Sequence, residues 1–599
     1  MANIKELVRK HTPDRTALLD VVADVQKELG CIPPEAAREI AAHLGLSAVD
    51  VEGVVTFYHF FSETPVGRYA VYLNTNIVSI MNGREAVARA FEREAGCRFG
   101  EVTPDGLIGL HDTSCIGMND QEPSAIINGV VFTRLNEAQV KDLVKAMKTG
   151  KDIDQMVWEL GDGANQSDLV HSMVRNDIRK AGPVILAPFE VGAALKKAVS
   201  LKPEEVINEI KLSNLLGRGG AGFPTGLKWE FCRREQSGSH YVACNADEGE
   251  PGTFKDRVIL TQMPHLLFEG MAVAGYAVGA ETGILYLRSE YAYLRAYLEN
   301  VLTRLRAAGI LGRNAAGKNG FNFDIQIKLG AGAYICGEES ALLESAEGKR
   351  GEPRDRPPFP VQVGYLGSPT TVNNVETLCA AARIMAHSAS WFKTMGTPKS
   401  AGTKLLSVSG DCRYPGIYEV EFGLTVRDLL ERAGGENAQA VQVGGPSGTC
   451  IPPEGFSRRL CFSDLATGGS IIVIGPERDL FQVVHNFMDF FVEESCGWCT
   501  PCRAGNVLLK NKLEKVMKGK GTAQDLAEME AWGKTIKAAS RCGLGQTSAN
   551  PILTTLQNFR PLYESKINKT ADFVPEFDLR TAVRDACLAS GRKARLEEE

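Results

Sequence analysis

Four cysteines near the C-terminal end of the sequence place the strongest constraint on its structure. Cys496, Cys499 and Cys502 are separated by two gaps of two residues, and Cys542 lies forty residues further on. Three thiolates in one tight loop with a remote fourth is the spacing expected for the corners of a [4Fe–4S] cluster. Zinc more often binds two separated cysteine pairs, so a zinc site or a chance grouping is the less favoured interpretation. The pattern therefore predicts a cluster held by these four residues.

Length and composition indicate several domains and a metal-binding or redox role for the thiols. The chain has 599 residues, far more than the roughly 250–300 at which one hydrophobic core stops growing. Its first residues carry scattered charges instead of the apolar run of a secretion signal, and no window of about 18–20 residues is apolar enough to span a membrane. Fifteen cysteines are too sparse for a disulfide scaffold. We therefore expect a cytoplasmic protein, and its net charge of -6 gives no general attraction to nucleic acid.

The periodicity of apolar residues changes along the chain. Helical spacing over residues 16–29 ends at Gly30, and from Tyr69 strand-like and helical stretches alternate. The expected segments are an alternating unit over 1–148, a glycine-rich polar connector over 149–182, a large α/β unit over 183–395, a strand–strand–helix unit over 403–475, a helical unit over 478–565 and a charged tail over 566–599. The expected fold class is multidomain α/β.

A glycine-rich loop, Gly217–Gly226, contains the spacing G-x-G-x-x-G. A dinucleotide fingerprint of this kind follows a strand, but residues 203–210 have helical character, and the Gly-Lys-Ser/Thr of a P-loop is absent. Backbone N–H groups of such a loop can still bind a phosphate or a flat ring, with Arg218 and Lys228 adding positive charge. A tight structural turn is the alternative interpretation of this loop taken alone.

Three further polar loops follow or lie near predicted strands. Asn245–Gly252 comes after the strand-like Tyr241–Cys244, Gly330–Ser340 joins a strand to a helix, and Thr371–Thr377 offers side-chain amides. Carboxylates accept hydrogen bonds from hydroxyl groups but repel phosphate. Together with the glycine loop, these segments predict one ligand site with a phosphate end and a polyol end.

Five motifs in this order resemble the FMN- and NADH-binding subunit of respiratory complex I and its relatives in NAD-reducing hydrogenases and NAD-dependent formate dehydrogenases. The motifs are Gly217–Trp229, Asn245–Arg257, Gly330–Leu342, Thr371–Thr377 and Ser495–Gly505. Residues 1–148 are similar to the thioredoxin-like [2Fe–2S] partner of that subunit. The fusion of the two most resembles the diaphorase alpha subunits of soluble NAD-reducing [NiFe] hydrogenases. This resemblance implies a helical start with a thioredoxin-like domain, an FMN- and NAD(H)-binding α/β domain, a small β-grasp-like domain and a helical [4Fe–4S] domain.

The resemblance also implies roles for individual residues. The implied FMN-binding residues are Gly217, Arg218, Gly219, Lys228, Asn245, Asp247, Gly337, Glu338, Asn373, Asn374 and Thr377. The implied NAD(H)-binding residues are Phe223, Phe231, Glu250, Tyr334, Glu339, Arg356 and Phe359. The implied cluster ligands are Cys496, Cys499, Cys502 and Cys542. No catalytic acid or base is implied, because hydride transfer belongs to the cofactor.

The N-terminal domain departs from the family it resembles. The family carries its [2Fe–2S] cluster on C-x4-C and C-x3-C pairs, whereas this sequence has Asn74 and Ser79 at the first pair and Cys115 and Asn119 at the second. A single cysteine cannot hold a centre that needs four ligands. We therefore expect a thioredoxin-like domain that has kept its fold and lost its cluster.

The implied activity is hydride transfer between NAD(H) and FMN, with single electrons exchanged with the [4Fe–4S] cluster. The implied partners are an iron–sulfur electron-transfer subunit and a [NiFe] hydrogenase module. A formate dehydrogenase beta subunit or a fused complex I subunit is the nearest alternative. A non-catalytic iron–sulfur conduit and a zinc-stapled scaffold are rivals from other classes, and both predict a protein without flavin.

Overall fold

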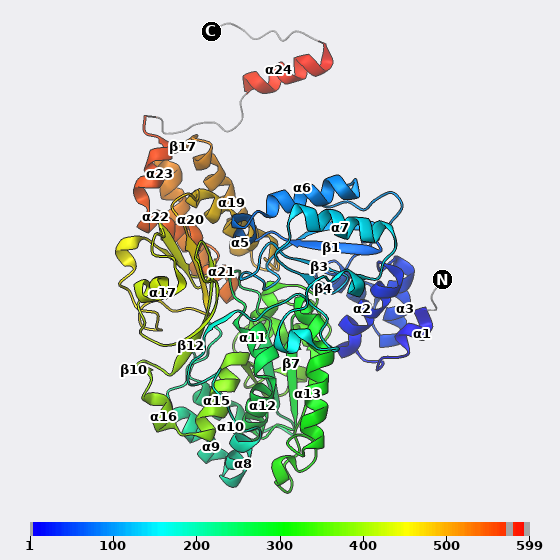
Figure 1. The fold of residues 1–599 in the computed structure, drawn as a ribbon, viewed down its shortest axis with the longest axis vertical. Helices are drawn as coiled ribbons and strands as arrows, with labels where there is room; N and C mark the ends of the chain where they lie inside the picture. Colours follow the sequence, from blue (N-terminus) through cyan, green and yellow to red (C-terminus); the bar gives the residue numbers. More distant parts are fainter. Residues whose placement is uncertain (1–3, 571–578, 592–599) are drawn as a thin grey trace.

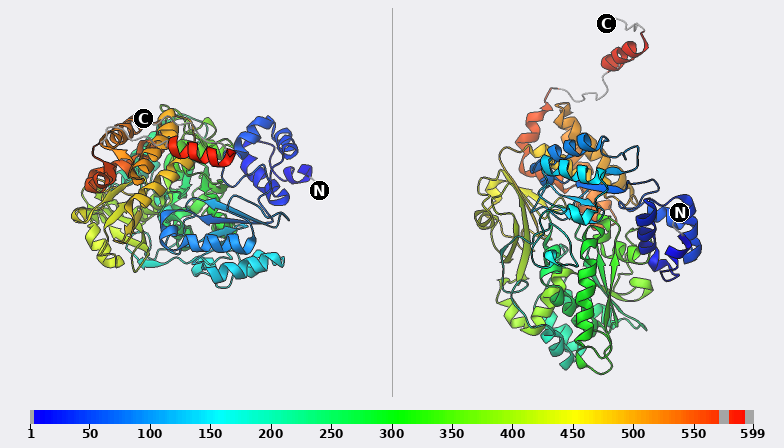
Figure 2. Two further views of the ribbon diagram at one scale, coloured as in Figure 1. Left: turned by 90° about the horizontal axis from the view of Figure 1, so that it is seen from above. Right: turned by 45° about the vertical axis from the view of Figure 1, so that its right-hand side comes forward.

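The computed structural model describes residues 4–570 and 579–591, which form several packed parts and one terminal helix set apart from them (Figure 1). Figure 2 shows the same arrangement from two further directions: the N-terminal helices lie at one side of the body, and α24 (Leu579–Ser590) stands clear of it. Of the tail expected over 566–599, residues 571–578 and 592–599 lie outside the described residues.

A small bundle of helices opens the described chain. The first long helix ends at Gly30, where a φ of 78° lets the Gly30 N–H reach the Gln26 carbonyl at 2.7 Å, so the predicted stop is confirmed. The next helix begins at Pro34, a position where the missing N–H of proline costs nothing. The bundle consists of α1 (Ile4–Val8), α2 (Leu18–Leu29), α3 (Pro34–Leu44) and α4 (Ala48–Val55).

The next part is a four-stranded sheet with strand order β2-β1-β3-β4. β1 pairs in parallel with β2 and antiparallel with β3, which in turn pairs antiparallel with β4. A parallel pair needs a crossover, and a helix between the two strands supplies it. The elements are β1 (Tyr69–Asn74), α5 (Ile77–Met81), α6 (Arg84–Ala95), β2 (Ile108–Thr113), β3 (Ala125–Ile127), β4 (Val130–Phe132) and α7 (Glu137–Lys148).

The largest part is built on a parallel sheet with strand order β8-β7-β6-β9, drawn in green in Figure 1. Its strands are β6 (Tyr241–Ala246), β7 (Thr282–Leu287), β8 (Asp324–Leu329) and β9 (Thr370–Asn374). Its helices are α8 (Ala193–Ser200), α9 (Pro203–Leu212), α10 (Thr225–Arg234), α11 (Lys255–Gln262), α12 (Pro264–Val278), α13 (Arg295–Ala307), α14 (Glu339–Ala346), α15 (Val375–Ala386) and α16 (Ala389–Lys393). Since α9 precedes the glycine loop, the loop follows a helix, as predicted. In open α/β sheets ligands bind outside the carboxyl ends of the strands, which is where the polar loops after β6 and β8 lie.

A smaller part contains a six-stranded sheet with strand order β15-β14-β16-β12-β13-β5. The predicted strands and helix are confirmed: the helix is capped by Thr425 and stops at Gly434, whose φ is 69°. The elements are β12 (Thr403–Gly410), β13 (Gly416–Glu421), α17 (Val426–Ala433), β14 (Ala440–Val443), β15 (Thr449–Ile451) and β16 (Ser470–Ile474), with the two short strands β10 (Gly396–Thr397) and β11 (Ser400–Ala401) before them. The edge strand β5 (Ile178–Lys180) comes from the segment expected to be a connector, and its pairing with β13 ties that segment to this sheet.

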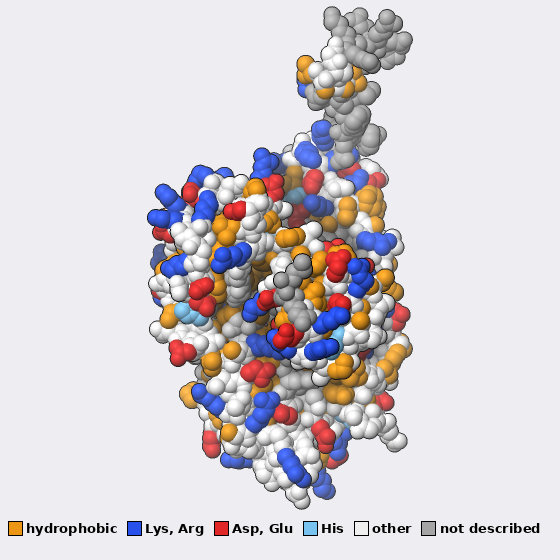
Figure 3. Space-filling model, turned by 90° about the vertical axis from the view of Figure 1, so that its right-hand side faces the viewer, with side chains coloured by type: hydrophobic (Ala, Val, Ile, Leu, Met, Phe, Trp, Pro, Cys, Tyr) orange, Lys and Arg blue, Asp and Glu red, His pale blue; other side chains and the backbone are white. Residues whose placement is uncertain are grey.

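Helices form the C-terminal part, as predicted. They are α18 (Leu480–Glu493), α19 (Thr500–Met517), α20 (Ala523–Ala539), α21 (Gly543–Thr547), α22 (Asn550–Asn558) and α23 (Arg560–Lys566), and the short β17 (Gly521–Thr522) and β18 (Ile567–Asn568) pair between them. None of the described helices is long and apolar enough to cross a membrane. Figure 3 shows acidic and basic side chains interspersed over the face that it presents, in keeping with a nearly balanced charge.

Candidate active site

A cavity of about 480 Å³ lies where three parts of the chain meet. The large domain lines it with Gly219, Gly220, Ala221, Asn245, Asp247, Glu248, Gly249, Glu250, Thr253, Lys255, Asp256, Tyr334, Ile335, Gly337, Glu338 and Asn374. The small sheet domain contributes Gly444, Ser447, Gly448, Ala466, Thr467 and Gly468, and the helical domain contributes Gly543, Leu544 and Thr547. Eight of the predicted ligand-binding residues therefore line one cavity: Gly219, Asn245, Asp247, Glu250, Tyr334, Gly337, Glu338 and Asn374.

The glycine loop forms one wall of the cavity with backbone alone at Gly219 and Gly220. A Cβ added at Gly219 would lie 3.3 Å from the Asn374 Cβ, and one added at Gly220, whose φ is 121°, would lie 3.9 Å from the Gly468 Cα. The loop is closed by the Gly217 N–H, which donates to the Phe223 carbonyl at 2.9 Å. Two glycine backbones from distant parts of the chain thus face each other across this wall.

The side chain of Arg218 does not reach the cavity, contrary to the expectation that its charge serves the ligand. Its guanidinium is buried and donates to the carbonyls of Leu216, Ala401 and Thr403 at 2.6, 2.8 and 3.2 Å. The ring of Phe422 lies 4.8 Å from the same group. Arg218 therefore fastens the glycine loop to the small domain. Its backbone N–H donates to the Thr377 hydroxyl at 2.8 Å, so both predicted residues support the loop from behind.

Asn373 also lies behind the cavity wall. Its side-chain oxygen accepts a hydrogen bond from the indole N–H of Trp229 at 2.9 Å, and both side chains are buried. The amide of its neighbour Asn374 lines the cavity instead, because successive side chains of β9 point to opposite faces.

The carboxyl end of β6 provides a buried acceptor. Asn245 donates to the Gly337 carbonyl at 2.8 Å and its oxygen accepts from the Asp247 N–H at 3.1 Å, which fixes the turn. Burial raises the pKa of Asp247 well above its ordinary value. Its Oδ2 atom is buried and has no hydrogen-bond partner among the described residues. An unsatisfied buried oxygen on a cavity wall is suited to a hydroxyl group of a ligand.

Glu338 offers a second such oxygen. Its Oε2 caps α14 by accepting from the N–H groups of Ser340 and Ala341, both at 3.0 Å. Its Oε1 accepts no hydrogen bond from the described residues and has the Arg356 guanidinium at 3.5 Å. Arg356 also lies 3.6 Å from Glu339. The charge of Arg356 is thereby held at the edge of the cavity by two carboxylates.

Other predicted residues do not line the cavity. Lys228 pairs with Glu339 at 2.9 Å and donates to the Val372 carbonyl at 3.2 Å. Phe223, Phe231 and Phe359 each expose between 41% and 47% of their surface. Large aromatic side chains left this exposed are available for stacking.

Glu250 connects the large domain to the small one. It accepts hydrogen bonds from the Tyr334 hydroxyl and from the N–H and hydroxyl of Ser447, the latter two at 2.8 and 3.0 Å. Burial raises the pKa of Glu250 to about 7, although the hydrogen bonds oppose this. The two residues that resemblance assigned to NAD(H) binding here are therefore in direct contact, and Ser447 is an additional member of the group.

Several lining residues were not predicted. Ser447 and Thr467 belong to glycine-containing loops of the small domain, more than 200 residues after the glycine loop in sequence. Their local signal, Gly444-Gly445-Pro-Ser-Gly448 and Thr467-Gly468-Gly469, is present in the sequence but resembles ordinary turns. Only their position opposite Gly219 in the folded chain identifies them as part of the site.

Three of the four clustered cysteines lie at the beginnings of two helices, and Cys496 lies in the loop before the first of them. Cys499 is the N-terminal cap of α19, Cys502 lies in its first turn, and Cys542 caps α21. Burial raises the pKa of Cys502 to about 11, a hydrogen bond with Ser495 opposes this rise, and the charges of the other three cysteines add to it. Gly545 leaves no space for a side chain, since an added Cβ would lie 2.5 Å from the Ser540 Cβ and 3.2 Å from the Cys502 Cβ.

These thiols do not form the compact shell of a single metal ion. Among the described residues, no group of three or more His, Cys, Asp or Glu side chains is arranged to hold one ion. A cubane binds each thiolate through a different iron, so its ligands stand further apart than those of one ion. Donor type and helix N-termini therefore fit an iron–sulfur cube.

The cysteine site and the cavity share a helix. Cys542 is followed directly by Gly543 and Leu544, both of which line the cavity. A ligand in the cavity would therefore contact the residues that directly follow Cys542. This adjacency is the geometry needed for electron transfer between two cofactors.

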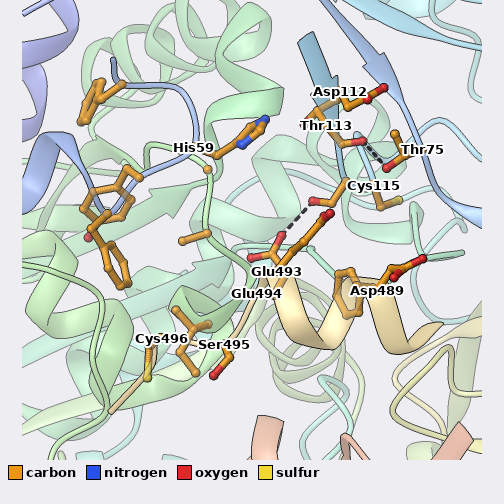
Figure 4. A pocket seen from close by; sticks show the side chains of 18 of the residues that line it. His59, Thr75, Asp112, Thr113, Cys115, Asp489, Glu493, Glu494, Ser495 and Cys496 are labelled. Atoms are coloured by element: carbon orange, nitrogen blue, oxygen red, sulfur yellow. Dashed lines mark hydrogen bonds between the residues drawn. The ribbon is translucent and has the colours of Figure 1, made fainter. Parts of the chain in front are cut away.

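A second cavity, of about 880 Å³, lies on the other side of the cysteines between the N-terminal segments and α18. Figure 4 shows Ser495 and Cys496 at one end of it and Asp112, Thr113 and Thr75 at the other. Glu493 and Glu494 lie between them.

A cavity with a glycine wall and two unpaired carboxylate oxygens, adjacent to one of four clustered cysteines, is the arrangement expected of a flavin- and iron–sulfur-dependent oxidoreductase. Family models agree with each part. The Nuo51 FMN-binding domain matches residues 210–383, and the NADH-ubiquinone oxidoreductase-F iron-sulfur binding region matches 482–566. The thioredoxin-like [2Fe-2S] ferredoxin matches 4–148, and the SLBB domain matches 405–450, where a small β-grasp-like domain is expected.

The chain belongs to the family of alpha subunits of NAD-reducing hydrogenases. It is 50% identical over 585 residues to the NAD-reducing hydrogenase HoxS subunit alpha of Cupriavidus necator, with 97% of each chain covered. It is 42% identical to the NADP-reducing hydrogenase subunit HndC of Solidesulfovibrio fructosivorans over 62% of this chain and 78% of that one. A chain in the crystal structure of an NAD+-reducing [NiFe]-hydrogenase in the H2-reduced state is 37% identical, with a TM-score of 0.88, 98% of this chain covered and 100% of the other.

These matches confirm the predicted resemblance, the predicted FMN and [4Fe–4S] cofactors and the predicted class of NAD-dependent oxidoreductase. They favour the interpretation as a hydrogenase subunit over a formate dehydrogenase or complex I component, because the hydrogenase relative matches 97% of this chain, including its N-terminal part.

Proposed function

We propose that this chain is the diaphorase subunit of a cytoplasmic NAD-reducing hydrogenase, which exchanges a hydride with NAD(H) and single electrons with its iron–sulfur partner subunit. The observation that carries this proposal is the cavity lined on one side by the glycine loop and on another by the residues that follow Cys542. The full-length likeness to a hydrogenase alpha subunit supports the choice of partner module.

FMN fits the donor set of the cavity. Backbone N–H groups around Gly219, Gly220 and Gly468 would hold its phosphate, since the walls there have no side chains. The free oxygens of Asp247 and Glu338 would accept from the ribityl hydroxyls, and Asn374 would bind the ring edge. Bound FMN would supply both two-electron chemistry, the acceptance of a hydride, and one-electron chemistry, the release of those electrons one at a time.

The dinucleotide would lie at the mouth of the same cavity. Phe223, Phe231 and Phe359 would stack on its rings, and Arg356, steadied by Glu338 and Glu339, would meet its phosphates. Glu250 and Tyr334 would shape the nicotinamide end, and the burial that raises the pKa of Glu250 to about 7 limits the negative charge there. The role of these residues is to orient two rings and exclude water.

Cys496, Cys499, Cys502 and Cys542 would hold the [4Fe–4S] cluster, with electrons leaving toward a partner iron–sulfur subunit and a [NiFe] module. The thioredoxin-like domain would carry no [2Fe–2S] cluster, because Asn74, Ser79 and Asn119 stand at three of the four ligand positions. The small sheet domain, β-grasp-like in its helix and strands, would serve as a wall of the flavin site.

The test is cofactor analysis of the purified chain followed by NADH addition. We expect one FMN and about four irons per chain, with the flavin absorption bleached by NADH. A colourless chain with one zinc would support the scaffold alternative, and a brown chain without flavin would support the conduit alternative. About six irons would instead show that the N-terminal domain retains a cluster.

A further inference from the structure

The loop of the thioredoxin-like domain that replaces the lost ligands packs directly against the flavin cavity. Asn119, which exposes 2% of its surface, accepts the Gly252 N–H at 3.1 Å and the Cys115 thiol at 3.1 Å through its side-chain oxygen. Gly252 ends the loop that lines the cavity with Glu248 and Glu250. A family ligand position has thus become a hydrogen-bond acceptor for the neighbouring domain.

A buried ion pair strengthens the same junction. Arg257 and Asp120 are both fully buried and 2.8 Å apart, and Arg257 also donates to the Gly117 carbonyl at 2.7 Å. The Arg257 backbone N–H donates to Glu248 at 3.1 Å. The contact therefore continues from the thioredoxin-like domain into a cavity-lining carboxylate.

A third connection reaches the other wall. The Ser114 hydroxyl donates to Glu494 Oε1 at 2.8 Å, and the Tyr334 N–H donates to Glu494 Oε2 at 2.8 Å. Tyr334 in turn donates to Glu250, and Cys496 follows two residues after Glu494. Figure 4 shows Glu494 between Cys115 and the segment Ser495–Cys496.

We propose that Asn119 is a positioning residue of the flavin site, and that the loop 114–120 holds the two cavity loops in register in place of a cluster. Gly252 has a φ of 85°, and an added Cβ would lie 2.3 Å from the Ser470 hydroxyl, so the loop is fixed on its other side as well. Loss of the acceptor leaves a buried N–H unpaired and frees the segment that carries Glu248 and Glu250. This role rests on the proposed assignment of the cavity to FMN and NAD(H).

The experiment compares Asn119→Ala, Asn119→Asp and the control Asn165→Ala in the full chain. Asn165 is fully buried and donates to Asn176 at 3.3 Å in the segment before β5, so its loss removes a comparable amide bond outside the cavity. We expect Asn119→Ala to raise the FMN dissociation constant and the KM for NADH about fivefold with kcat little changed. Hydrogen exchange over residues 248–254 of the flavin-free chain should accelerate. Asn119→Asp, which keeps the accepting oxygen, should restore the FMN dissociation constant, the KM and the exchange rate to the values of the parent chain.

Equal loss of thermal stability in Asn119→Ala and Asn165→Ala, with flavin affinity, KM and exchange over 248–254 unchanged, would overturn the proposal. If Asn119→Ala does not fold, Ser114→Ala tests the same connection between the loop 114–120 and the cavity loops. An unchanged KM in that variant would also overturn the proposal. A parent chain that purifies without flavin contradicts the proposed function itself. If the parent chain binds flavin and the variants behave like the parent, only the positioning role is contradicted.

Discussion

Glu122 is a buried carboxyl group whose protonation should control the stability of the thioredoxin-like domain. It exposes 8% of its surface and accepts hydrogen bonds from the Asn74 amide and, at 2.8 Å, from the Ser124 hydroxyl. Burial raises its pKa from 4.5 to about 8. The group thus lies beside one of the positions at which the family has a cluster ligand.

The size and sign of the effect follow from this pKa. A folded-state pKa above the unfolded one means that the contribution to stability is complete below pH 4.5 and is lost as the pH rises through 8. The full difference corresponds to at most about 5 kcal/mol, of which about 3 kcal/mol is lost between pH 5 and pH 7. Glu122→Gln cannot ionise, so it should remove this part of the pH dependence.

The assay is hydrogen exchange by mass spectrometry on peptides from β1 and β3, corrected for the intrinsic pH dependence. From pH 5 to pH 7, protection in the parent should fall by about 100-fold relative to Glu122→Gln, while peptides from α19 in the same samples should not distinguish the two proteins. Parallel curves for parent and variant across this range would show that Glu122 is ionised in the folded state and would refute the reasoning.

Two further predictions concern the helical domain. Cys542→Ser removes the implied ligand that caps α21, so the iron content should fall well below four per chain while FMN is retained. The control Cys461→Ser replaces a similarly buried cysteine of the small domain and should keep both FMN and iron. Full iron content in Cys542→Ser would contradict the ligand assignment. Although burial opposes it, hydrogen bonds from Lys512 and Lys515 lower the pKa of Asp525 to about 2. Asp525→Asn should therefore lower the free energy of unfolding, measured with denaturant at pH 7, by about 2 kcal/mol. This difference from the parent chain should disappear as the pH falls from 3.8 toward 2. An equal difference at pH 2 would argue against this ion pair.

Local structure could be predicted well from the sequence because its signals are local. The stop at Gly30 depends on residues within one turn of the helix end. The four cysteines were recognisable for the same reason, since three of them lie within seven residues.

The composition of the cavity could not be predicted in full, because it depends on which loops meet. Nothing near Ser447 or Leu544 in sequence indicates that they lie opposite the glycine loop. The direction of a side chain could not be predicted either: Arg218 follows a glycine in a loop expected to bind a phosphate, yet its guanidinium donates to three carbonyls and lies over the ring of Phe422. The edge strand β5 was missed because three exposed residues carry no strand pattern until β13 is available to pair with them.

The N-terminal helices pack around two of the clustered cysteines. Helices α2–α4 share one hydrophobic core with the buried Cys502 and Cys542 and with strands of the large domain. At its centre, the buried Tyr58 hydroxyl donates to the Ser345 hydroxyl and the Lys349 carbonyl, both at 2.8 Å, in and after α14. Because burial and hydrogen bonding around a cluster set its reduction potential, a segment that shares the core of Cys502 and Cys542, two proposed cluster ligands, can influence that potential without binding any metal. Under the proposed assignments, the N-terminal domain would support electron transfer without a cluster of its own, since it would enclose the neighbouring cluster on one side and hold the flavin loop through Asn119 on the other.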